Sequence, residues 1–321
     1  MSETVERALC EVAGFTRVSG VEKLTGGASR ETLRFDADGA RYIVQSQRTG
    51  SPRDMHVEIA VLEAAHRLGV PVAEVVADSR GTSGHPVLGD RFMVVRAVEG
   101  ETIARKILRD DRFVAARQLL PAQIGRAMAQ LHRIDHTTID GLEGDDQVVK
   151  YRELLDESGQ HHPAFEIAFR WLEANRPEPN PQCLVHGDFR LGNLIVGDDG
   201  LRAVLDWELA HIGDPAEDLG WVCVRAWRFG ADKPVAGVGH YAALLDAYAE
   251  ESGRRITEHD LRWWELLGTV KWGLMCISQA AYHLNGTKRS HELAAIGRRV
   301  CENEYDALVT IRELATRAAS R

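Results

Sequence analysis

The spacing of hydrophobic and polar positions divides the chain into a strand-rich part followed by a helical part. Short runs rich in β-branched and aromatic residues, 32–35 and 41–44, flank Asp-Ala-Asp-Gly and predict a β-hairpin. Residues 53–68 carry apolar positions at helical spacing and are followed by a glycine, which predicts a helix. Two further strands are expected at 71–77 and 92–98.

From residue 102 onward the apolar positions recur mainly at helical spacing. Helices are expected over 121–132, over 260–283 and through most of the chain after 241. A second hairpin is expected at 194–205, around Gly-Asp-Asp-Gly. At 321 residues the chain is longer than a single hydrophobic core usually grows, so we expect two lobes.

Composition and charge narrow the classes of partner. The 39 basic and 48 acidic residues give a net charge of −9, so no basic field would concentrate nucleic acid or an anionic membrane. No run approaches about eighteen apolar residues, and the acidic N-terminus lacks a signal pattern. We therefore expect a cytoplasmic protein with neither nucleic acid nor membrane as partner, and the oligomeric state stays open.

The segment 184–221 holds the densest set of chemically useful side chains. Asp188 and Asn193 lie five residues apart in an expected loop, and Asp206 follows the second strand of the hairpin. Phosphoryl transfer needs a carboxylate to orient and deprotonate an alcohol, hard oxygen ligands for Mg²⁺ and electrostatic cover for the phosphates. Each residue alone would suit a turn, but the set indicates phosphoryl transfer.

The motif His186-Gly-Asp-x-x-x-x-Asn193 and the later Asp206-Trp-Glu resemble the aminoglycoside phosphotransferase and choline kinase-like superfamily. The form Asp-Trp-Glu, followed by Gly-Asp-Pro and Asp-Leu-Gly-Trp, is most similar to the kinase-like domain fused to some acyl-CoA dehydrogenases. The resemblance implies an α+β, bilobal protein-kinase-like fold, with a small antiparallel sheet in the N-lobe and a mainly helical C-lobe. It also implies a nucleotide-binding lobe over 1–98, a hinge near 94–100 and a catalytic and acceptor-binding lobe over 101–321.

The resemblance assigns roles within the catalytic segment. Asp188 is the expected catalytic base, and His186, grouped with it, is expected to shape the loop. Asn193 and Asp206 are the expected Mg²⁺ ligands. Asp214 and Asp218 are expected to accept backbone N–H groups and brace the loop.

The nucleotide lobe matches the family less closely. Gly26 and Gly27, with Ser29, fit a loop that covers the phosphates. Gln45 stands where the family carries a lysine or arginine, and a glutamine brings no charge. Arg48 could reach in instead, or the site could be weakened; Arg30 is expected to face solvent.

Two further expectations complete the nucleotide side of the site. Glu58 stands where the family places the acidic partner of the strand cation. It could pair with Arg48, position metal-bound water or simply be solvated. The backbone around Val95, from 94 to 97, is expected to meet an adenine edge.

Acceptor contact is expected from the helical lobe, with Trp221, Arg225 and Lys271 as candidates. His132 is expected to be a structural histidine. The favoured function is transfer of the γ-phosphoryl group of ATP or GTP, with Mg²⁺, to a hydroxyl of a small metabolite or antibiotic. A nucleotide-binding regulatory module with weak or lost transfer, motivated by Gln45, is the alternative. Aminoglycosides, hydroxyacyl-CoA thioesters and amino alcohols all remain open as acceptors.

Overall fold

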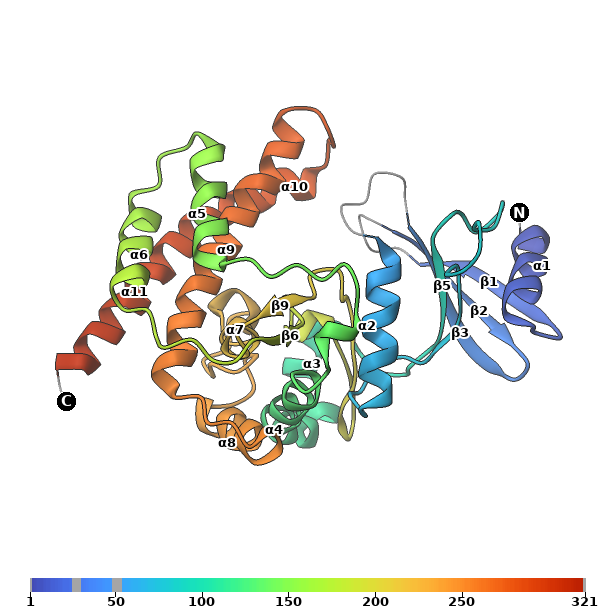
Figure 1. The fold of residues 1–321 in the computed structure, drawn as a ribbon, viewed down its shortest axis with the longest axis horizontal. Helices are drawn as coiled ribbons and strands as arrows, with labels where there is room; N and C mark the ends of the chain where they lie inside the picture. Colours follow the sequence, from blue (N-terminus) through green and yellow to red (C-terminus); the bar gives the residue numbers. More distant parts are fainter. Residues whose placement is uncertain (1, 25–29, 48–53, 320–321) are drawn as a thin grey trace.

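A computed structural model describes residues 2–24, 30–47 and 54–319 of the chain (Figure 1). The predicted nucleotide contacts Gly26, Gly27, Ser29 and Arg48 lie outside these described residues. Within them, no helix is both long and apolar enough to cross a membrane.

The N-terminal part is a five-stranded antiparallel sheet in the order β1-β2-β3-β5-β4. The strands are β1 (Val18–Lys23), β2 (Arg30–Ala37), β3 (Ala40–Gln47), β4 (Val75–Asp78) and β5 (Phe92–Arg96). The predicted hairpin is confirmed as β2 and β3, joined at Asp38 and Gly39, both of which have positive φ. Asp and Gly are residue types that tolerate this left-handed conformation.

Strand alternation sends the side chains of β5 into two different hydrophobic cores. Phe92 and Val94 pack in a small cluster with residues of α1 (Ser2–Ala13), whereas Met93 and Val95 join the large core that contains α2 (Met55–Arg67). Successive strand residues point to opposite faces, which explains this division. In Figure 1, α1 lies on the outer side of the sheet and α2 lies between the sheet and the helical part.

The C-terminal part is built mainly of helices. These are α3 (Ala104–Arg109), α4 (Val114–Leu131), α5 (Gln147–Ser158), α6 (Pro163–Ala174), α7 (Ala216–Trp221), α8 (Tyr241–Ser252), α9 (Glu258–Leu284), α10 (His291–Ile296) and α11 (Val300–Ala319). Helix α9, whose first turn is capped by the Thr257 hydroxyl, packs against α5, α6, α7, α10 and α11. Its buried positions surround the helix through much of its length, as expected for a central helix.

Two short antiparallel strand pairs hold the loops of the segment 184–221 side by side. Strands β6 (Cys183–Val185) and β9 (His211–Gly213) form one pair, and β7 (Leu194–Gly197) and β8 (Gly200–Val204) form the other. The loop from β6 to β7 carries Asp188, and the loop from β8 to β9 carries Asp206. The Leu205 N–H donates to the Asn193 carbonyl at 2.8 Å, which ties the two loops together.

The structure corrects two predicted boundaries. The helix expected from residue 121 begins at Val114, and Pro121 lies inside it. Pro121 packs against Gly239, where a Cβ would meet the proline Cγ at 2.1 Å. The strand expected from 71 begins only at Val75, because Val72 is buried in the large core before the chain enters the sheet. Helix α1 was not predicted.

Candidate active site

Asp188 is held by hydrogen bonds from three different side chains. Its Oδ1 accepts from Trp221 Nε1 at 2.9 Å and from Arg190 Nε at 3.0 Å, and its Oδ2 accepts from Asn193 Nδ2 at 2.6 Å. The side chain is 13% exposed, so it is mostly enclosed but still reachable. The carboxylate therefore has a fixed orientation before any substrate binds.

His186 shapes the catalytic loop and does not contact the Asp188 carboxylate. Its buried ring accepts the Asp188 N–H at Nδ1 (3.1 Å), and its Nε2 lies 3.0 Å from the Leu205 carbonyl oxygen. The carbonyl can only accept, so the ring proton is on Nε2. Burial lowers the pKa of His186 and keeps it neutral. The expected structural role agrees with this geometry.

Asp218, from α7, braces the same loop from behind. It accepts the N–H groups of His186 at 2.8 Å and Gly187 at 3.0 Å, and His132 Nε2 lies 3.1 Å from it. Burial disfavours the charged carboxylate, but the hydrogen bond and charge of His132 outweigh it and lower the pKa of Asp218 to about 2. The predicted bracing role of Asp218 and the structural role of His132 are confirmed.

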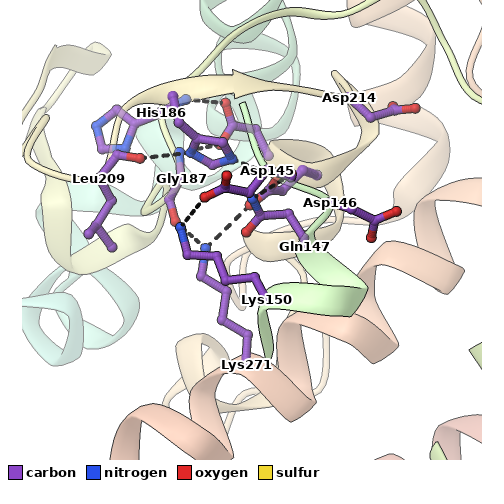
Figure 2. A network of polar contacts seen from close by, with 12 residues as sticks. Asp145, Asp146, Gln147, Lys150, His186, Gly187, Leu209, Asp214 and Lys271 are labelled. Carbon is purple, nitrogen blue, oxygen red and sulfur yellow. Dashed lines mark hydrogen bonds and ion pairs between the residues drawn. The ribbon is translucent and has the colours of Figure 1, made fainter. Parts of the chain in front are cut away.

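Gly187 is required by both backbone conformation and space. Its φ is +77°, and a Cβ there would lie 2.5 Å from the Leu209 carbonyl oxygen. The Gly187 carbonyl in turn accepts from Lys271 Nζ at 2.8 Å. Figure 2 shows the Lys271 side chain extending from α9 toward Gly187. Lys271 also lies 3.3 Å from Glu217, so its charge is balanced within the fold.

Two of the three expected acceptor contacts are buried. Lys271 is 4% exposed and Trp221 is 1% exposed, and each directs its polar group at the catalytic loop. We therefore correct their role from acceptor contact to bracing of the loop that carries Asp188. Arg225, the third, lines a cavity of about 780 Å³.

Asp206 has a left-handed backbone conformation, with φ of 65°. Partial desolvation and the negative charges of Glu208, Asp188 and Glu58 raise the pKa of Asp206 to about 7. Since Asp206 itself is exposed to solvent, its desolvation is partial, and the crowding of like charges is the effect that a cation would relieve.

The residues around Asp206 fit a hard cation such as Mg²⁺. Asn193 directs its Nδ2 at Asp188, which turns its amide oxygen the other way. Carboxylate and amide oxygens are the ligands that Mg²⁺ and Ca²⁺ prefer. Among the described residues, no cluster of three His, Cys, Asp or Glu side chains has metal-binding geometry, so the fit rests on this acid and amide pair.

Arg30, a partly buried arginine on β2, places a positive charge beside Gln45. Arg30 Nη1 donates to Glu58 Oε1 at 2.8 Å, and its Nη2 contacts the other Glu58 oxygen. The Arg30 side chain is 13% exposed and that of Glu58 is 3% exposed. Burial opposes the charge of Arg30, but the hydrogen bond and charge of Glu58 outweigh it and raise the pKa of the guanidinium. The expectation that Arg30 faces solvent is wrong.

The β2–β3 register explains why Arg30 lies beside Gln45. Arg30 is paired with Gln47, and Gln45 is two residues back on the same face of β3. Arg30 Nη1 accordingly donates to Gln45 Oε1 at 3.3 Å, and Nη2 lies 3.9 Å from Glu208. The hairpin turn fixes this register, so counting back from Asp38-Gly39 would have revealed the pairing.

The backbone around Val95 is largely used by the sheet. Val95 lies between Ile43 of β3 and Val75 of β4. The N–H groups of Arg96 and Ala97 donate to the carbonyls of Glu74 and Arg41, each at 2.9 Å. These two donors are therefore not open to an adenine edge, and the expected contact of the other backbone groups of 94–97 with a base stays a prediction.

Arg190 is a residue of the candidate site that was not predicted from the sequence. Besides its bonds to Asp188, its guanidinium lies 4.9 Å from the centre of the Trp227 ring. Its position two residues after Asp188 was the feature of the sequence that could have indicated a place in the site.

The comparisons with known proteins agree with this geometry. A family model described as the phosphotransferase enzyme family (APH) matches residues 20–264. Acyl-CoA dehydrogenase family member 11 from Homo sapiens is 29% identical over 215 residues, covering 62% of this chain. The match spans only 27% of that relative's length.

Solved structures share the fold across nearly the whole chain. A protein from Ralstonia eutropha JMP134, provisionally named an aminoglycoside phosphotransferase, has a TM-score of 0.77 at 22% identity, with 98% of each chain covered. A thermostable mutant of aminoglycoside phosphotransferase APH(4)-Ia, in ternary complex with ADP and hygromycin B, has a TM-score of 0.61 at 16% identity. That comparison covers 96% of this chain and 98% of the other. The bilobal kinase-like fold is thus confirmed, and by its match to the family model the chain belongs to the phosphotransferase enzyme family.

Proposed function

We propose that the protein is a kinase that transfers the γ-phosphoryl group of ATP, or of GTP, to a hydroxyl group of a small molecule. The observation that supports this most is the convergence of three parts from distant segments. They are the oriented carboxylate of Asp188, the acidic group around Asp206 and the buried Arg30–Glu58 pair. Arg30 Nη2 lies 3.9 Å from Glu208, two residues after Asp206, and the Leu205 N–H donates to the Asn193 carbonyl at 2.8 Å, so the three parts lie next to one another.

Asp188 would receive the acceptor hydroxyl as a hydrogen-bond donor. As the acceptor oxygen bonds to the γ-phosphorus, its proton passes to the Asp188 carboxylate, and the bond from the γ-phosphorus to the β-phosphate oxygen breaks. Trp221, Arg190 and Asn193 keep the carboxylate oriented, which reduces the entropy lost on reaching the reactive arrangement.

Arg30 would provide the positive charge next to the nucleotide phosphates, held in place by Glu58. Mg²⁺, bound through Asp206 and the Asn193 amide oxygen, would offset the charge of the phosphates. The Gly26–Gly27 loop with Ser29 would cover them, and the connection after β5 would meet the base. In this proposal residues 1–98 form the nucleotide lobe and 101–321 the catalytic and acceptor lobe.

The alternative of a regulatory module with lost transfer was motivated by Gln45 alone. The pairing of Arg30 with Glu58 removes that motive, because a cation is present beside the Gln45 position. Transfer is therefore the function we favour.

The test is direct detection of a phosphorylated product. Purified protein with Mg²⁺ and ATP or GTP is incubated with hydroxylated acceptors, including aminoglycosides, amino alcohols and hydroxyacyl-CoA thioesters, and the added phosphoryl group is detected by mass. Asp188→Asn should lower kcat by about 10²–10⁴ while nucleotide affinity is retained, because proton transfer is lost and binding is not. Full turnover by Asp188→Asn would show that Asp188 is not the base.

A further inference from the structure

A cavity of about 780 Å³ lies in the helical lobe, lined by the start of α3, the 3₁₀ helix Arg225–Arg228 and the beginning of α11. Small-molecule sites commonly have volumes of about 300–1,000 Å³. The cavity is therefore large enough for a metabolite rather than a few waters.

Arg190 and Trp227 connect this cavity to the catalytic aspartate. Arg190 donates to Asp188 at 3.0 Å, and its guanidinium lies over the Trp227 ring. Trp227 belongs to the same 3₁₀ helix as Arg225 and Ala226, which line the cavity. Arg190 and the Trp227 ring thus lie between the Asp188 carboxylate and the helix that lines the cavity.

The charged lining of the cavity is predominantly basic. It contains three arginines and two acids, which leaves one positive charge in excess; these residues are Arg105, Arg225, Arg299, Glu302 and Asp306. Arg299 Nε pairs with Glu302 at 3.1 Å, and Arg225 Nε lies 3.7 Å from Asp306. Arg225 also contacts Glu313 at 3.3 Å. Both acids of the lining are therefore already next to arginines of the lining.

Arg105 carries the excess charge. It is exposed, and it has no ion-pair partner within the part of the chain that the structure describes. A cationic acceptor would have to compete with arginines for each acid, whereas an anion would meet an available guanidinium.

We propose that the acceptor is a hydroxylated organic anion whose carboxylate or phosphate group binds in this cavity, with Arg105 as a principal contact. This rests on the proposed kinase function. The acceptor hydroxyl lies toward Asp188 and gives it its proton, its oxygen bonds to the γ-phosphorus, and the nucleoside diphosphate leaves. The anionic end of the acceptor takes no part in bond making and determines specificity.

Acceptors that differ only in charge provide the test. One matched set is 8-hydroxyoctanoate, 1,8-octanediol and 8-amino-1-octanol, which share the reacting hydroxyl and carry negative, neutral and positive ends. Sets of about six to ten carbons allow for the separation between Asp188 and the cavity and for its volume, and 8-hydroxyoctyl phosphate separates a phosphate ester from a carboxylate. Product is measured by mass, and ADP release is followed in parallel.

Variants at Arg105 locate the anion site. Arg105→Gln should raise the KM for the anionic acceptor about tenfold, as expected for one charge-assisted hydrogen bond, with kcat and the KM for nucleotide unchanged. Arg105→Lys should restore most of the affinity. Arg109→Gln, on the same helix but outside the cavity lining, is the matched control and should behave as wild type.

Two results would overturn the acceptor proposal while the kinase function stands. One is phosphorylation of neutral or cationic members with kcat/KM equal to or above that of the anions. The other is identical kinetics for Arg105→Gln and Arg109→Gln.

If no acceptor is phosphorylated, calorimetry with the anions and the Asp188→Asn protein still decides the proposal, because absence of binding would contradict it. Absence of nucleotide binding as well would contradict the kinase function itself.

Discussion

Asp206 combines a left-handed backbone conformation with a position among acidic side chains. Asparagine tolerates the same conformation and has nearly the same shape, so Asp206→Asn removes the charge with little backbone strain. The substitution therefore separates the electrostatic effect of this residue from its effect on the loop.

Asp206→Asn should stabilise the metal-free protein at neutral and higher pH. The folded pKa of about 7 lies above the ordinary value of 3.8, so the folded state holds this proton more tightly than the unfolded state. Stability is then lost progressively as pH rises from about 4 to about 7. Because Asp206 is exposed and screened, we expect a Tm gain of about 2–4 °C at pH 8 and almost none at pH 4, measured by thermal melts with chelator.

Asp232→Asn is the control for this experiment, since Asp232 is exposed and outside the site. It should leave the pH dependence unchanged. A gain for Asp206→Asn that is equally large at pH 4, or a lower Tm at pH 8, would contradict the electrostatic account of Asp206.

Single residues of the site differ in how readily sequence predicts them. Asp188 and Asn193 were predictable because their spacing is a property of one loop. The contacts of Trp221, Lys271 and Arg190 were not, because apolar spacing on a helix does not say which side chain reaches another segment. Arg30 was not predicted as a site residue, although the register of the hairpin places it near Gln45. The reason is that the family carries its cation at the Gln45 position on β3.

At the scale of elements, α7 and α4 hold the catalytic loop through one buried carboxylate. Asp218 on α7 accepts two loop N–H groups, and His132 at the C-terminal end of α4 contacts the same carboxylate. His132 Nδ1 is 3.1 Å from the Tyr248 hydroxyl of α8. Three helices and the loop are thus joined at one point.

Asp218→Asn should destabilise the protein by about 3 kcal/mol at pH 7, the loss typical of breaking a buried charged pair. The lowered pKa of Asp218 means that its stabilisation is present above the ordinary value of 3.8 and is lost as pH falls toward 2. Urea unfolding should therefore show a difference from wild type that shrinks below pH 4. Asp246→Asn, at an exposed position of α8, should have little effect, and equal stabilities for the two variants would refute the bracing role.

Most elements could be predicted from local patterns, and those that could not depend on distant contacts. The hairpin of β2 and β3 follows from its turn chemistry and α9 from its apolar spacing. The early start of α4 depends on the space that Gly239 leaves for Pro121. The late start of β4 depends on the burial of Val72 in the large core, which local spacing does not reveal.

At the scale of the whole molecule, the proposed site lies between two parts. The sheet contributes the cation Arg30, and the helical lobe contributes Asp188 and the proposed acceptor site. Arg30 lies at this junction, since it binds Glu58 of α2 and lies 3.9 Å from Glu208 of the segment after β8. The central claim is that this arginine on β2 does what a lysine or arginine on β3 does elsewhere in the family.

Moving the cation back to β3 tests that claim most directly. We expect Arg30→Gln to lower kcat/KM for nucleotide about 10- to 100-fold, the effect of losing charge-assisted hydrogen bonds. Arg30→Gln with Gln45→Lys should recover much of this loss, because a lysine at position 45 can pair with Glu58. Gln45→Lys alone should bring no gain, since Glu58 is already paired.

The decisive measurement is phosphoryl transfer by these three variants, with thermal melts to confirm that each is folded. Loss in Arg30→Gln and recovery in the double variant are the predicted results. Unchanged transfer by folded Arg30→Gln, or a double variant no better than Arg30→Gln, would contradict the assignment of Arg30 as the phosphate-binding cation.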